Sequence, residues 1–164
     1  MAGNSFIKLS GCKGESLQKG FEGAQGWIEI GDWGWEITNE SNFLKGTGSA
    51  GGKATPGALN WSHYYDTSSP TIMKNVIQGK AFDEVEIAMC KNTGGDNPER
   101  FFTLKMKSVF IQKATMKGGE DGTVNQEVEM TVKDVEIDYK QQDNKGKLLA
   151  PIKSGWDIAT NTAR

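Results

Sequence analysis

Apolar and polar residues alternate along most of this chain with the two-residue period of β-strands. Short alternating runs lie at Phe6–Leu9 and Glu84–Lys91, and longer ones at Trp27–Thr38, Phe102–Ile111 and Val124–Tyr139. The 21 glycines cluster between these runs, as expected where short connections join strands. The pattern predicts a mainly β domain whose later strands form an antiparallel meander.

Each of the three longer runs moves its apolar positions to the opposite parity partway along. The change falls near Gly31 and Asp32 in the first run, at Lys107-Ser108 in the second and at Lys133-Asp134 in the third. A turn joining two strands is the alternative, but the second and third positions contain neither glycine nor proline. We therefore expect bulges, which bend strands round a β-barrel.

One helix interrupts the strands at about residues 69–79. Ser69 is placed to cap it, Pro70 suits its first position and Gly79 suits its end. The expected apolar stripe against the barrel consists of Ile72, Met73, Val76 and Ile77. The polar positions expected to face away are Lys74, Asn75 and Gln78.

A long extended loop at about residues 39–57 lies between two strand runs. Its glycines at 46, 48 and 51 match a dinucleotide-binding spacing, but no helical pattern follows them, and Gly51-Gly52-Lys53 lacks the remaining residues of a phosphate-binding loop. We interpret the loop as an arm that grips a neighbouring copy, anchored by Phe43 and Leu44. The candidate interface residues are Asn39, Phe43, Leu44, Lys45, Gly46, Gly48, Gly51, Gly52 and Lys53.

Length and charge limit the classes of function. A chain of 164 residues that is 36% hydrophobic predicts a single domain over 1–164. Its net charge of -2 argues against nucleic-acid binding, and neither a signal peptide nor an apolar run of membrane-spanning length is present. Cys12 and Cys90 lack CxxC spacing, so we expect buried free thiols in a reducing cytosol.

Candidate chemistry is sparse. His63 is the single histidine, and a catalytic or metal site would have to recruit Cys12, Cys90 or Asp66 without supporting spacing. Acidic residues such as Glu136 alternate with apolar ones and indicate a solvated face. We therefore expect no enzyme, no metal and no cofactor. The five tryptophans favour a core role, and a soluble carbohydrate-binding β-domain is the alternative function.

Taken together, several segments give the chain a resemblance to the Hcp family, the haemolysin-coregulated proteins of bacterial type VI secretion. The segments are FIKLSGCKGES at Phe6–Ser16, WIEIGDWGW at Trp27–Trp35, the arm ending in Gly52-Lys53, Asp66 with SSP at Ser68–Pro70, Gly79-Lys80, GGEDG at Gly118–Gly122, Ile137–Tyr139 and GWDI at Gly155–Ile158. The chain departs from many members at Leu17–Gln25, where Phe21 and extra glycines replace an acidic, histidine-containing run.

The resemblance implies a barrel of two antiparallel β-sheets with one flanking helix. It further implies a tube subunit that forms stacked hexameric rings under a VgrG spike and inside a contractile sheath. The lumen would carry or chaperone effector proteins. The protein would lie in the bacterial cytoplasm and be exported to the extracellular space or a target cell by type VI secretion.

Overall fold

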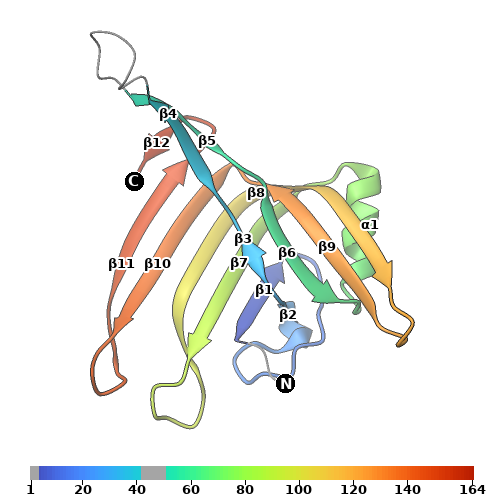
Figure 1. Cartoon of the computed structure of the whole chain (residues 1–164), viewed down its shortest axis with the longest axis horizontal. Helices are drawn as coiled ribbons and strands as arrows, with labels where there is room; N and C mark the ends of the chain where they lie inside the picture. The colour runs from blue at the N-terminus through green and yellow to red at the C-terminus, as the bar shows by residue number, and fades with distance from the viewer. Residues whose placement is uncertain (1–3, 42–50) are drawn as a thin grey trace.

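The computed structural model describes residues 4–41 and 51–164, and its mainly β character agrees with the sequence pattern (Figure 1). One helix, α1, packs against β8. In chain order the elements are β1 (Ser5–Leu9), the 3₁₀ turn η1 (Gly23–Gln25), β2 (Trp27–Glu29), β3 (Trp33–Gly34), β4 (Ile37–Ser41), β5 (Gly51–Pro56), β6 (Leu59–Tyr64), α1 (Ser69–Gln78), β7 (Phe82–Lys91), β8 (Glu99–Gly118), β9 (Val124–Thr131), β10 (Asp134–Gln142), β11 (Leu148–Asp157) and β12 (Thr162–Ala163).

The long strand β8 belongs to two layers of antiparallel strands. Its first part pairs with β7 and β10 in a layer ordered β12-β11-β10-β8-β7-β1-β2. Its second part pairs with β9, which continues the ladder through β6 to β3. The inner faces of both layers contribute to one cluster of buried side chains, so the layers are the two walls of a barrel.

β8 changes face at Ser108, as predicted, but not through a bulge there: its register with β7 continues from Lys107 to Val109, and its register with β9 shifts between Ile111 and Lys113. Ser108 has a φ of 53°, in the left-handed region, and the buried positions change parity from Met106 to Val109 across it. The third run differs from the prediction of one strand, because Val132 and Lys133 leave the ladder between β9 and β10. The two pieces nevertheless follow β8 round the same bend, since both pair antiparallel with it.

The prediction of one bent strand over Trp27–Thr38 is wrong. The run divides into β2, β3 and β4, which pair with β1, β6 and β5 respectively. At the predicted phase change the chain passes between layers: the Ile30 amide donates to the Ser5 carbonyl at 3.0 Å and the Gly31 amide to the Ser62 carbonyl at 2.8 Å. Among the described residues, no strand pairing connects the β2 edge of the first layer with the β3 edge of the second. These two hydrogen bonds connect the layers there.

A second apolar cluster lies on the outer face of the first layer and holds the connection between β1 and β2. Phe21 stacks on Phe6 with ring centroids 4.6 Å apart and meets Trp27 edge-on at 4.8 Å. The Arg100 guanidinium lies over the rings of both Phe21 and Trp27 and pairs with Glu86. Phe21, in the segment that departs from the family pattern, therefore ties that segment to the sheet.

The helix begins and packs differently from the expectation. Ser68, not Ser69, is the N-cap, and the Asp66 carboxylate accepts the Ser68 amide at 2.9 Å, so Asp66 stabilises the turn before α1. Asn75 is buried, whereas Ile77 is 78% exposed, so both were assigned to the wrong side of the helix. Gly79 ends α1 in the left-handed conformation, as predicted.

Ser108 gives a direct test of the bend. Glycine adopts a positive φ without the Cβ penalty of about 1 kcal/mol, so Ser108→Gly is expected to raise the free energy of unfolding or leave it unchanged. The control Thr115→Gly, elsewhere in β8, is expected to lower it by about 0.5–1 kcal/mol. Urea unfolding measures both, and equal losses would contradict the strained bend.

Candidate functional site

The described part of the arm is a two-stranded ribbon, β4 paired with β5, that projects from the barrel (Figure 1). Thr38 lies opposite Thr55 and Asn39 opposite Ala54 in its register. Among the described residues this ribbon pairs with no further strand. Of the predicted interface residues, Asn39 and Lys53 are exposed on the ribbon, Gly51 and Gly52 lie in β5, and Phe43, Leu44, Lys45, Gly46 and Gly48 lie outside the described residues.

The base of the arm is tied to the barrel by Trp35. Its indole packs against the core and its Nε1–H donates to the Gly57 carbonyl at 3.0 Å. The Gly57 amide donates to the Glu36 carbonyl at 2.8 Å, and a Cβ at Gly57 would lie 2.7 Å from Glu36 Cγ. Trp35 and Gly57 thus fix where the ribbon leaves the body. Sequence reasoning assigned Trp35 to the core and missed this second role.

The side chains of the β4–β5 ribbon are largely exposed, so few buried contacts stabilise it. Thr38, Asn39, Lys53 and Thr55 are all exposed, and so is nearly half of the Ile37 side chain. A single two-stranded hairpin is marginally stable in water. A second surface that covers the ribbon would supply the missing contacts.

The outer face of the first layer carries charges whose sign alternates from strand to strand. Lys8 on β1 lies opposite Glu86 on β7, Glu86 opposite Lys105 on β8, and Lys105 opposite Glu136 on β10. Charges of opposite sign that face one another across two antiparallel strands stabilise the pairing modestly. Glu136 is exposed, whereas the residues before and after it in β10 are buried or half-buried. The prediction that Glu136 belongs to a polar outer face is therefore confirmed.

The same charged face engages the last residue of the chain. The Arg164 guanidinium donates to both carboxylate oxygens of Asp134, at 2.9 and 2.6 Å, and this hydrogen bonding raises the pKa of Arg164. The Arg164 amide also donates to the Gly155 carbonyl at 2.7 Å. These contacts hold the segment of β12 against β10 and β11.

His63 lies inside the barrel and is 5% exposed. Its Nε2 is 2.7 Å from Oε1 of buried Gln126, and its Nδ1 is 3.9 Å from Oδ1 of Asp66. Burial lowers the pKa of His63, and the contacts with Gln126 and Asp66 only partly oppose this. The imidazole is therefore neutral at pH 7, and its ring packs beside Trp61 as a core side chain.

The cysteines are buried free thiols, and neither is an activated nucleophile. Burial, and then the negative charge of Asp66, raise the pKa of Cys12 to about 11. Burial also raises the pKa of Cys90. Within residues 4–41 and 51–164, no group of three or more His, Cys, Asp and Glu side chains is arranged to hold a metal ion.

None of the five indoles stands exposed on the surface. Trp27 and Trp61 are buried, while Trp33, Trp35 and Trp156 are half-buried and pack against the barrel core. A carbohydrate platform needs aromatic faces open to solvent. The core role expected for the tryptophans agrees with these positions. Across the described ranges, α1 is too short to span a bilayer, and no membrane-crossing helix is found.

A family model described as "Type VI secretion system effector, Hcp" matches residues 6–143. Because this match spans most of the chain, the protein belongs to the Hcp family.

Individual relatives agree with this assignment. Protein hcp1 of Pseudomonas aeruginosa is 29% identical over 164 residues, covering 98% of each chain. A solved structure of a type six secretion system protein is 27% identical, with a TM-score of 0.89 over 99% of this chain and 100% of its own. Hcp1 from Salmonella typhimurium, at 23% identity, shares the fold with a TM-score of 0.75 over the whole of both chains.

The depressed pKa of His63 predicts a pH dependence of stability. In the unfolded chain His63 takes up a proton near pH 6.5, whereas in the folded protein it does so only at lower pH. Protonation therefore favours the unfolded chain, and the contribution of neutral His63 to the free energy of unfolding is complete only above pH 6.5. The free energy of unfolding is expected to fall from pH 7.5 to 5.5, by at most about 1.4 kcal/mol per pH unit.

Urea titrations at the two pH values measure this effect in the native chain and in His63→Gln. Because His63 is the single histidine, the substitution is expected to remove most of the pH dependence in this window. An unchanged slope in His63→Gln would show that other groups are responsible.

Proposed function

We propose that the protein is a non-enzymatic tube subunit of the type VI secretion system. Copies of it form hexameric rings that stack into a tube, carry or chaperone effector proteins in the lumen, and are themselves secreted. The observation that carries this proposal is the projecting ribbon of β4 and β5, which has no covering surface among the described residues of its own chain. Membership of the Hcp family supports it.

In this proposal the arm is the contact between neighbours within a ring. A closed ring of identical subunits needs a heterologous contact, in which one surface of each copy meets a different surface of the next. The candidate residues for the arm side are those of the predicted interface, with Phe43 and Leu44 as apolar anchors. The whole chain, 1–164, acts as one domain in this arrangement.

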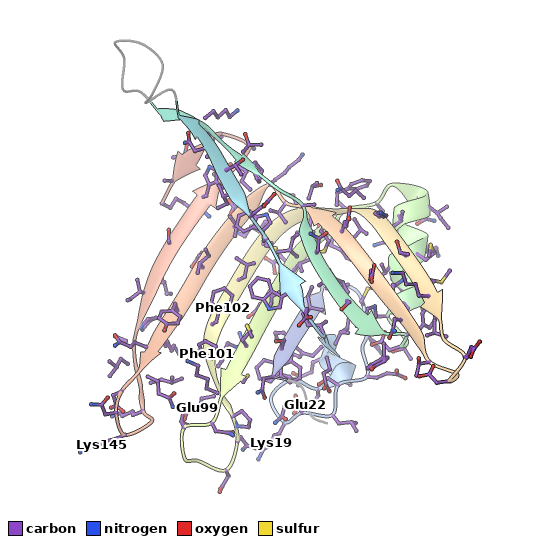
Figure 2. The ribbon with its side chains drawn as sticks, in the orientation of Figure 1. Lys19, Glu22, Glu99, Phe101, Phe102 and Lys145 are labelled. Atoms are coloured by element: carbon purple, nitrogen blue, oxygen red, sulfur yellow. The ribbon has the colours of Figure 1, made fainter. Side chains whose placement is uncertain are left out.

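Stacking of rings requires two different ends. The arm leaves one end of the molecule, while the connections that carry Lys19, Glu22 and Lys145, and the start of β8 at Glu99, lie toward the other (Figure 2). Rings related head to tail would therefore place unlike ends together, and such contacts repeat without limit. Rings stacked in this way would grow into a filament rather than a closed shell.

The remaining partners come with the proposed tube. They are a VgrG spike at its tip, a contractile sheath around it and effector proteins inside it. Export from the bacterial cytoplasm would proceed through the secretion apparatus. Catalysis has no part in the proposal, in keeping with the raised thiol pKa values and the buried neutral histidine.

Shortening the arm tests the proposed ring. Deletion of residues 43–52 is expected to leave a folded barrel that elutes as a monomer, because the buried core residues of the described part of the chain lie outside the deleted segment. Size-exclusion chromatography with light scattering gives the mass, and negative-stain microscopy shows whether rings are present. Rings that persist after the deletion would rule out the arm as the clamp.

A double substitution that keeps the length of the arm separates the effect of its apolar anchors from the effect of its length. Phe43→Ser combined with Leu44→Ser is expected to weaken the rings as the deletion does. The control Lys74→Ser, at an exposed position of α1 outside the predicted interface, is expected to leave them intact. A native chain that stays monomeric at high concentration would overturn the tube itself.

A further inference from the structure

An open cleft lies where the chain passes from the first layer to the second. It is bordered by the connection after β2, by the end of β6 with the residues that follow it, and by the start of β9. Its volume is about 710 Å³, a size that small-molecule ligands occupy. The cleft is separate from the arm and from the charged outer face of the first layer.

Carboxylates dominate the wall of this cleft. Five acidic residues line it, and none of the described residues that line it is a lysine or an arginine: the acids are Glu15, Glu29, Asp32, Asp66 and Glu127. Glu127 pairs with Lys117 outside the cleft, at 3.4 Å, whereas Glu15 and Asp32 lie exposed at its mouth. A concave surface lined by charges of one sign focuses their field and concentrates counter-ions. The cleft therefore attracts cations.

The buried side of the cleft holds two hydrogen-bond acceptors that face one another. Because the Gln126 Oε1 atom can only accept, the Nε2–H of His63 donates to it at 2.7 Å, and the Nδ1 atom of neutral His63 keeps its lone pair. No described group donates to this Nδ1, although His63 is 5% exposed. The Asp66 Oδ1 atom, 3.9 Å away, is an acceptor too. A donor that reaches both atoms would satisfy the buried nitrogen.

Two tyrosines add aromatic surface to the same cleft. Tyr64 is 71% exposed and Tyr65 is 40% exposed, and both line it. Aromatic faces attract ammonium groups as carboxylates do. The acidic residues come from separate segments, and no three of the described His, Cys, Asp and Glu side chains are grouped as metal ligands. Acceptors spread out in this way, beside aromatic rings, suit an extended organic cation.

We propose that this cleft binds a small linear polycation with primary ammonium groups, of the polyamine class. One ammonium group carries three N–H donors, enough to serve both the His63 Nδ1 and the Asp66 Oδ1 atoms. A carboxylate oxygen accepts more than one hydrogen bond, so Oδ1 also keeps its bond from the Ser68 amide. The remaining ammonium groups meet Glu15 and Asp32 at the mouth. This site depends on neither the arm nor the tube.

Titration calorimetry with spermidine, at constant ionic strength, tests the site. The native chain is expected to bind one spermidine per chain, and Glu15→Gln with Asp32→Asn is expected to weaken binding by about tenfold or more. The control Asp96→Asn with Glu120→Gln removes the same charge from exposed positions outside the cleft and is expected to keep the native affinity. Equal weakening in both variants, or no saturable binding by the native chain, would overturn the proposal.

The aromatic contribution has a separate test. Tyr64→Leu is expected to weaken spermidine binding by about two- to fivefold, because an exposed cation–π contact contributes about 0.5–1 kcal/mol. The control Tyr139→Leu, on β10 and outside the cleft, is expected to bind as the native chain does. An equal effect of the two substitutions would contradict a contact with Tyr64.

Competing cations identify the occupant. Mg²⁺ at the same ionic strength is expected to leave spermidine bound, and equal displacement by Mg²⁺ would show a general attraction for cations and overturn the proposal. A trilysine peptide carries the same ammonium groups on side chains and is expected to compete less well than spermidine. Tighter binding of trilysine would mean that the cleft receives lysine side chains of another protein, and the polyamine assignment would fail.

Discussion

The architecture depends on one strand that serves two sheets. β8 donates and accepts hydrogen bonds in both layers, and the change of layer is possible because Ser108 adopts a left-handed conformation between the two segments. The arrangement of the strands that pair with β8 on either side of Ser108 depends on this bend. β9 and β10 turn with it, and the apolar positions of β8 change parity so that Met106 and Val109 both face the core.

The bend in β8 was open to prediction because its cause is local. Apolar residues at the wrong parity must move to the other face or lie in water, and no glycine or proline at Lys107-Ser108 offered a turn instead. The barrel, the helix end at Gly79 and the burial of both cysteines follow from equally local signals. The division of Trp27–Thr38 does not, because each piece is defined by a partner strand distant in sequence.

The helix and the arm mark where local reasoning fails. Asn75 is buried and Ile77 exposed because the position of α1 against β8 is set by tertiary packing, which overrides a stripe inferred from four residues. The double role of Trp35 depends on Gly57, which returns beside it only after the whole arm has been traversed. No spacing in the sequence links an indole to a carbonyl twenty-two residues away.

The single histidine gives this fold a spectroscopic reporter of its own. His63 lies between the layers, with its ring beside Trp61 and its Nε2 within hydrogen-bonding distance of Gln126 on β9. A proton nuclear magnetic resonance spectrum of the chain therefore contains one set of imidazole signals, shifted by the ring current of an adjacent indole. Those signals identify a packed barrel without a label, in any variant of the arm or the outer surface that keeps the core intact.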